Sequence, residues 1–147
     1  MQKMKATKSD LIEASINLSA NDLSDFDSML GGRNPLDVFP KALDDTTHVI
    51  KSNGKVLAVG GHGGGGIWFV TTGVVSRLSK PERYKFYRIL REHLAWVRHD
   101  AGSNKALTNF VALGNVLHVR LLEKLGAKFQ AGHVMSPAGF PFKQFWL

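Results

Sequence analysis

The chain contains no cysteine among its 147 residues, which excludes disulfides and thiolate metal sites and leaves the redox compartment open. It also has no apolar run near the ~20 residues that a membrane-spanning helix needs. The first ten residues are polar and hold no signal-peptide core. These absences lead us to expect a soluble protein that remains in the cytoplasm where it is made.

Acidic residues are comparatively few, because 12 Asp+Glu stand against 19 Lys+Arg and the net charge is +7. Such an excess attracts anions, including nucleic acid, anionic surfaces and phosphate-bearing cofactors, although an ordinary soluble protein also carries it. With 147 residues and 44% hydrophobic content, the chain suits a single domain, residues 1–147, with a core of its own.

The most informative stretch is residues 105–129, where the apolar pattern changes its period. The β-formers of 107–113 predict a buried central strand, and the helical spacing in 116–125 predicts an amphipathic helix. Gly126 stands where a left-handed helix cap is expected, and a new strand follows. A strand, a helix and a strand in this order predict a mixed α/β sheet. The expected apolar arc of the helix consists of Leu117, His118, Leu121, Leu122 and Leu125.

The front third predicts a short strand and then two or three short helices. Residues 4–7 are expected to form the strand, and residues 9–18 the first helix. The second helix opens with Ser19 and Asp22, which resemble a capping box, and stops at a pair of glycines. Residues 36–43 predict one or two further helical turns.

The middle of the chain predicts antiparallel strands. The Asn53-Gly54 dipeptide between two β-branched runs predicts a hairpin of residues 47–51 with 55–59. The glycine run 60–66, with His62 inside it, has two interpretations, a phosphate cradle or a flexible loop between antiparallel strands. The loop is favoured, because phosphate loops normally open a helix and here a strand follows.

A long helix is predicted from Ser79, which forms a capping box with Glu82, to about Arg98. Pro81 lies in the first turn, where its missing N–H matters little. The basic face of this helix would either meet nucleic acid or simply be solvated. Its expected buried stripe is Phe86, Ile89, Leu90, His93, Leu94 and Val97, and its basic face is Arg83, Lys85, Arg88, Arg91 and Arg98.

The C-terminal part predicts a strand at 130–135, a turn at 136–139 and a final strand at 140–147. Pro141 favours an edge or the start of a strand. The resulting order of elements resembles that of the GNAT acetyltransferase superfamily over nearly the whole chain. Residues 115–129, NVLHVRLLEKLGAKF, look like the late motif of that superfamily, in which an Asn starts a helix that ends in a Gly-aromatic step. Here Ala127 and Lys128 separate Gly126 from Phe129.

With TTHVIKSNGKVLAVGG, IWFVTT and the closing GFPF, the chain more narrowly resembles small GNAT-like proteins of tailed bacteriophages, including the internal virion protein of short-tailed podophages. The resemblance implies an α+β (α/β) fold with a mixed, mostly antiparallel sheet of about six to seven strands. About four helices would flank this sheet. The resemblance also implies an acyl-CoA site where the fourth strand and the third helix diverge.

In relatives, a glycine-rich turn and a helix N-terminus bind the pyrophosphate of acyl-CoA through free amides and the helix dipole. The equivalent turn here, residues 72–81, departs from that pattern because Gly73 is its only glycine and Pro81 removes one donor. The resemblance therefore implies weak binding of acetyl-CoA and no metal. The implied cofactor-binding residues are Val70, Thr71, Thr72, Arg77, Ser79, Lys80 and Asn115.

No catalytic residue is identified by the pattern. Many relatives have a tyrosine that acts as general acid where this chain has Leu122. Neither Tyr84 nor Tyr87 is expected near that segment. His62 is expected in an exposed loop, where it would either be inert or act as a base near a substrate entrance. His118 is expected in the core with a hydrogen bond to backbone. No histidine pair has the spacing of a metal site.

Two functions compete. The leading hypothesis is a phage GNAT-like domain with degenerate acyl-CoA and catalytic positions. It would bind a phage or host protein in virion assembly, within the cytoplasm of the infected bacterium or in the virion. The alternative is an active acetyl-CoA-dependent N-acetyltransferase acting on a protein or small-molecule amine. A basic nucleic-acid-binding module is third, because only the charge supports it.

Overall fold

The computed structural model describes residues 1–102 and 106–147. One mixed sheet of eight strands has the order β1-β2-β3-β4-β5-β8-β6, with β7 beside β8. The strands are β1 (Gln2–Lys5), β2 (His48–Ser52), β3 (Lys55–Gly63), β4 (Gly66–Thr71), β5 (Thr108–Ala112), β6 (Lys128–Phe129), β7 (Val134–Met135) and β8 (Pro141–Trp146). The helices are α1 (Lys8–Ile16), α2 (Ala20–Met29), α3 (Pro35–Val38), α4 (Lys80–Asp100) and α5 (Val116–Lys124), with short 3-10 turns η1 (Pro40–Ala42) and η2 (Gly73–Arg77).

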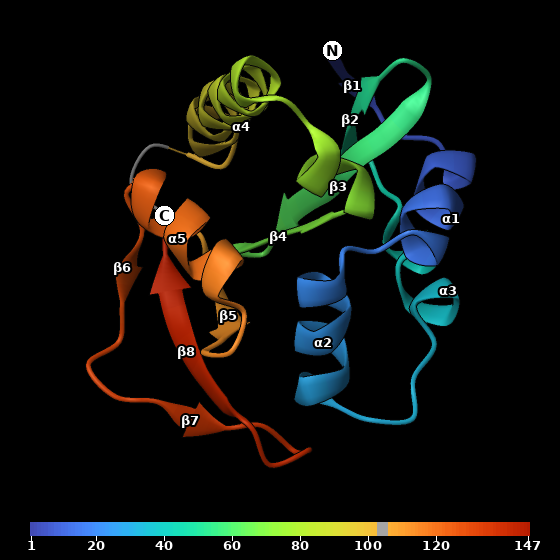
Figure 1. Ribbon diagram of the computed structural model, residues 1–147. Coiled ribbons are helices and arrows are strands. Elements are labelled where there is room, and N and C mark those ends of the chain that lie inside the picture. Colours follow the sequence, from blue (N-terminus) through green and yellow to red (C-terminus); the bar gives the residue numbers. More distant parts are fainter. Residues whose placement is uncertain (103–105) are drawn as a thin grey trace.

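All pairings in this sheet are antiparallel except β4 with β5. Helices lie on both faces, with α1 beside α3 and α2 beside α5 (Figure 1). This architecture confirms the expected mixed, mostly antiparallel fold. It has one strand more than expected, because the segment after α5 forms two separate two-residue strands, β6 and β7, each paired with β8.

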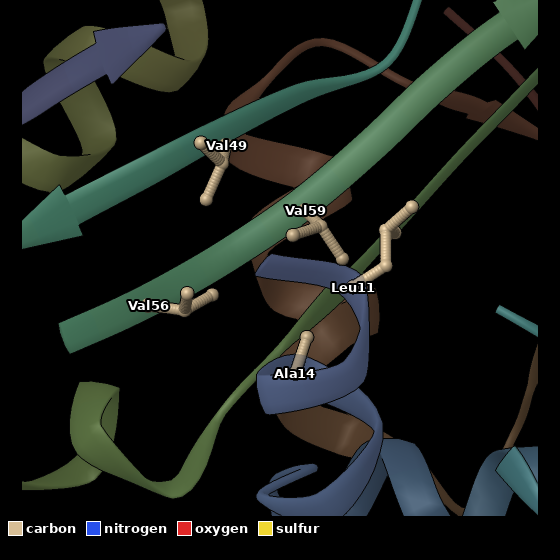
Figure 2. Close-up of a cluster of buried hydrophobic side chains, with 5 residues drawn as sticks. All are labelled: Leu11, Ala14, Val49, Val56 and Val59. Carbon is tan, nitrogen blue, oxygen red and sulfur yellow. The ribbon is translucent and has the colours of Figure 1, made fainter. Parts of the chain in front are cut away.

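The two faces of the β2–β3 hairpin supply two hydrophobic clusters. On one face, Leu11 and Ala14 of α1 pack with Val49, Val56 and Val59 (Figure 2). On the other face, the cluster consists of Ile50, Leu57, Ala58, Leu78 and Phe86. Each buried aliphatic side chain of this size contributes about 1.5–3 kcal/mol through removal from water. The hairpin is therefore the part of the sheet that holds α1 and α4 in place.

The β2–β3 hairpin confirms the prediction from Asn53 and Gly54, which adopt positive φ angles of 51° and 73°. The glycine run differs from expectation, because β3 continues through Gly63 and only Gly64 and Gly65 form the turn. His62 thus lies within a strand and is 7% exposed, so its expected place in an exposed loop is wrong. A Cβ on Gly60 would lie 2.6 Å from the Trp68 carbonyl oxygen on the neighbouring strand, so this position in β3 requires glycine.

The N-terminal elements begin earlier than predicted. The strand predicted at residues 4–7 is β1, Gln2–Lys5, which starts two residues earlier. Thr7 rather than Ser9 caps α1, through a reciprocal capping box with Asp10. Near the other end, Pro141 is the first residue of β8, as its missing N–H predicted. β8 lies between β5 and β6, so the last strand is internal to the sheet.

The helix α5 ends as predicted. Gly126 has a φ of 88°, and the amides of Gly126 and Ala127 donate to the carbonyls of Glu123 and Leu122. Leu122 is fully buried, but Leu117 is 61% exposed, so the expected apolar arc is wrong at that residue. In the third core cluster, Leu122 packs with Leu94, Val111, Phe145 and Leu147.

Candidate functional site

The parallel strands β4 and β5 meet at one end only. Gly66 pairs with Thr108, and the Asn109 side chain donates to the Ile67 carbonyl at 2.7 Å. Beyond this point no backbone pairing joins the described residues of the two strands, and they diverge toward their C-terminal ends. A gap therefore separates these central strands toward their C-terminal ends, and α4 follows β4 through η2.

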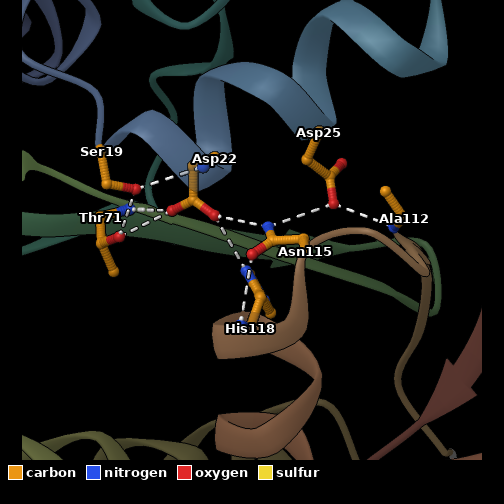
Figure 3. A network of polar contacts seen from close by, with 7 residues as sticks. All are labelled: Ser19, Asp22, Asp25, Thr71, Ala112, Asn115 and His118. Carbon is orange, nitrogen blue, oxygen red and sulfur yellow. Dashed lines mark hydrogen bonds and ion pairs between the residues drawn. The ribbon is translucent and has the colours of Figure 1, made fainter.

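Two carboxylates of α2 bridge this gap (Figure 3). Asp22 accepts hydrogen bonds from the backbone N–H and the hydroxyl of Thr71 at the end of β4, both at 2.7 Å. Asp25 accepts a hydrogen bond from the backbone N–H of Ala112, the last residue of β5, at 2.9 Å. Because adjacent turns of one helix place side chains three residues apart on the same face, α2 reaches both strands at once.

Asn115 and His118 complete the network from the start of α5. The Asn115 amide donates to Asp22 at 3.0 Å and to Asp25 at 3.3 Å, and its oxygen accepts from the backbone N–H of His118. The Nδ1 atom of His118 lies 3.2 Å from Asp22 Oδ1. The His118 ring lies 4.5 Å from that of Phe69, centroid to centroid. Asn115 is therefore the N-cap of α5 and also a donor that holds two carboxylates together.

The two carboxyls respond differently to the same burial. Burial would raise the pKa of Asp22, but the hydrogen bond and charge of His118 and the bonds from Thr71 outweigh it and lower that pKa to about 2. Burial is also the main influence on Asp25, and there the bonds from Ala112 and Asn115 do not offset it, so its pKa is raised. Asp22 is thus a firmly ionised acceptor at the centre of the network.

Two clefts lie on either side of this network. One, of about 420 Å³, is bounded by the end of β4, η2 and the start of α5. The other, of about 340 Å³, is lined by aromatic side chains of α2, β4 and β5, including Phe26, Trp68 and Phe110. Asp22, Phe69 and His118 belong to the walls of both. The Asp22–His118 pair therefore separates two spaces that the gap would otherwise join.

The turn from Thr72 to Pro81 engages most of its amides within the protein. The N–H of Gly73 donates to the Asn17 carbonyl, and that of Leu78 donates to the Val75 carbonyl. The Thr72 hydroxyl caps η2 by accepting from Val74.

At the start of α4, Ser79 and Glu82 form the predicted reciprocal capping box, in which Glu82 accepts from the Ser79 N–H at 2.7 Å. These hydrogen bonds lower the pKa of Glu82. Arg83 reaches back to the carbonyls of Leu78 and Ser76. A pyrophosphate would have to displace the Glu82 carboxylate from the helix N-terminus, so the turn as arranged does not fit that group.

The seven residues predicted to bind the cofactor lie at three different locations. Thr71, Thr72 and Asn115 line the cleft beside η2, where Thr71 and Asn115 are also bound to Asp22. Val70 lines the aromatic cleft. Arg77, Ser79 and Lys80 are exposed and are not on the wall of either cleft. Contact of these seven residues with acyl-CoA stays a prediction.

Sequence reasoning missed the main features of the site. It treated Asp22 as a capping residue, whereas the Ser19 hydroxyl accepts from the Asp22 amide and the Asp22 carboxylate serves β4 and α5 instead. His118 pairs with a carboxylate rather than with backbone, so that expectation is wrong. The available signal was the spacing of Asp22 and Asp25, which places two acids on one face of a short helix.

Other candidate residues are also placed by the structure. Tyr87 does lie near α5, contrary to expectation, because its hydroxyl donates to the Lys124 carbonyl at 3.0 Å. Leu122 is buried in the core. Within residues 1–102 and 106–147, no group of three or more His, Asp or Glu side chains is arranged to hold a metal ion. No helix in the same two segments has the length and apolar character to cross a membrane.

Solved acetyltransferases share this architecture. An acetyltransferase of the GNAT family from Streptococcus pneumoniae superposes with a TM-score of 0.56 at 16% identity, covering 99% of this chain and 96% of that one. The ribosomal-protein-alanine N-acetyltransferase from Brucella melitensis superposes with a TM-score of 0.53 at 14% identity, covering 99% and 98% of the two chains. The protein therefore has a GNAT-like fold, and the likeness at these identities concerns the fold alone.

Within that class, the chain belongs to the family described as Bacteriophage T7, probable scaffold protein Gp13, whose model matches residues 46–134. The probable scaffold protein gp13 of Escherichia phage T7 is 37% identical over 93 residues. The matched part covers 62% of this chain and 62% of that relative. The expected link to phage proteins is confirmed, and the family is described as a scaffold protein rather than as an internal virion protein.

Proposed function

We propose that this protein acts in phage virion assembly as a non-catalytic binding component built on a GNAT-like fold. Membership of the Gp13 family is the observation that carries the proposal. The network at the β4–β5 gap supports it, because Asp22 and Asp25 tie both strands to α2 where an acyl-CoA arm would otherwise lie. Its partners would be phage or host proteins, met in the infected cell during assembly.

Assembly is tested by following a tagged protein in phage-infected cells. We expect it to co-sediment with assembling particles, and quantitative mass spectrometry of purified particles then distinguishes two roles. A scaffold protein leaves before maturation, whereas an internal virion protein, the narrower role that the sequence resemblance implies, remains in mature particles. Absence from both kinds of particle would overturn the proposal. The matched control is an unrelated tagged protein of similar size and charge.

The alternative function, acetyl-CoA-dependent N-acetyl transfer, is favoured by the fold. It would require the Ser79–Glu82 capping box to open and a group that accepts the proton of the attacking amine. A ligand at about 100 times its dissociation constant stabilises a protein by about 2.7 kcal/mol, which thermal unfolding detects readily. We expect no shift of the unfolding midpoint with millimolar acetyl-CoA. A saturable shift would instead favour the enzyme.

A further inference from the structure

Aromatic and basic side chains gather where α4 crosses the first strands of the sheet. The His93 ring lies 4.7 Å from that of His48 and 5.5 Å from that of Trp96, centroid to centroid. The Lys3 ammonium lies 3.2 Å from His93 Nδ1 and 5.5 Å from the Trp96 ring. Because an ammonium only donates, His93 accepts through Nδ1, and its imidazole is neutral.

A small apolar cavity of about 60 Å³ lies behind these side chains, between the sheet and α4. Its inner wall is aliphatic and includes Ile50, Ala58, Leu90, Leu94 and Val97. One water needs roughly 10–15 Å³ of such space, so the cavity has room for about four groups of that size. A water inside would find few polar partners, and the space suits a short hydrocarbon chain better.

Three basic side chains, Lys3, His48 and His93, also line the cavity, and burial lowers the pKa of His48. Burial, followed by the charges of Lys3 and His48, lowers the pKa of His93 to about 3. The Asp100 carboxylate is bound to His62 Nε2 at 2.9 Å and is not part of the cavity wall. An apolar space that ends at an ammonium group is complementary to an aliphatic tail that carries a negative charge.

We propose that this cavity binds an alkyl carboxylate with a tail of about four carbon atoms. The carboxylate would lie on the Lys3 ammonium beside the His93 ring, and the tail would lie among Ile50, Leu90 and Leu94. Such a group occurs in free short-chain fatty acids and at the C-terminus of a polypeptide that ends in an aliphatic residue. The site is separate from the β4–β5 gap network, and the proposal does not depend on a role in assembly.

Calorimetric titration with pentanoate tests the proposal, with pentanamide as an uncharged ligand of the same shape. We expect saturable binding of pentanoate, and binding at least about tenfold weaker for pentanamide and for the Lys3→Gln variant. Lys55→Gln removes the same charge from an exposed residue at the start of β3, outside the cavity, and should leave binding unchanged. N-acetyl-leucine and its amide form a second pair. Tighter binding of N-acetyl-leucine than of pentanoate identifies a polypeptide C-terminus as the source, and the reverse identifies a free acid.

A cavity-filling variant gives an independent test. Ala58→Val adds side-chain volume inside the cavity and should abolish binding of pentanoate while thermal unfolding shows that the protein is folded. If that variant does not fold, Leu90→Phe, on the half-buried side of α4, serves the same purpose. The proposal is overturned by equal affinity for pentanoate and pentanamide, by unchanged affinity in Lys3→Gln, or by a lack of saturable binding of both carboxylates.

Discussion

Asp22 shows how the tertiary environment changes the role of one side chain. A Ser-x-x-Asp sequence ordinarily forms a capping box, and half of that box is present because Ser19 accepts from the Asp22 amide. The carboxylate instead accepts from the Thr71 amide and hydroxyl, from Asn115 and from His118. Its side chain is 6% exposed, and without it the Thr71 amide and the His118 ring would lose the partner that they have here.

Replacing Asp22 is therefore expected to destabilise the protein strongly. Asp22→Ala should lower the free energy of unfolding by about 3–5 kcal/mol, because it leaves buried donors and His118 unpaired. Asp22→Asn should lower it less, since an amide oxygen still accepts. Urea unfolding measures both. Asp27→Ala, on the exposed side of the same helix, should change stability by no more than about 0.5 kcal/mol. An equally small effect for Asp22→Ala would contradict the role given to the network.

At the scale of elements, agreement with the sequence follows the range of the interactions involved. The hairpin at Asn53-Gly54 and the capping box of α4 were predicted, because each depends on residues a few positions apart. The extension of β3 through His62 was not predicted, because it depends on the cross-strand partner Ile67. The predicted strands after Gly126 and over residues 130–135 are each reduced to two residues, β6 and β7, because only those residues pair with β8.

The end of α5 offers a test at this scale. Gly126→Ala should destabilise the protein by about 1–2 kcal/mol, because an L-residue at a φ of 88° brings its Cβ close to its own carbonyl group. A Cβ at this residue meets no atom within 4 Å, so the expected loss comes from backbone conformation and not from a clash. Gly132→Ala is the control, since a Cβ there also meets nothing within 4 Å and its φ is not positive. Equal stability of the two variants in chemical denaturation would refute the explanation.

At the scale of the whole molecule, protonation links the packing of α4 to pH. The pKa of His93 is depressed to about 3 by burial and by Lys3, Lys5, His48 and His62. The folded protein then binds fewer protons than the unfolded chain, so stability present above the unfolded pKa near 6.5 is lost as the pH falls toward 3. Asp22, with a pKa of about 2, adds a further loss below about pH 4, whereas the raised pKa of Asp25 acts in the opposite direction.

We therefore expect the free energy of unfolding to decrease by roughly 1–3 kcal/mol between pH 7 and pH 4, after allowance for the partial exposure of His93. His93→Gln should flatten this dependence, because it removes the titrating group while retaining an amide beside Lys3. His99→Gln, at an exposed position of the same helix, should leave the pH profile unchanged. A His93→Gln profile as steep as that of the wild type would count against this assignment. Urea unfolding at each pH provides the measurement.

The sequence alone determined the hairpin turn, the caps at Ser79 and Gly126 and the mixed α/β class, because these depend on side chains close together in the chain. The order of elements was sufficient for the GNAT-like resemblance. Only the tertiary structure decided the chemistry of the gap, where His118 meets Asp22 across 96 positions and Ala112 meets Asp25 across 87. Contacts over such separations arise from the way α2 and α5 pack against the diverging strands, and no local pattern of residues records them.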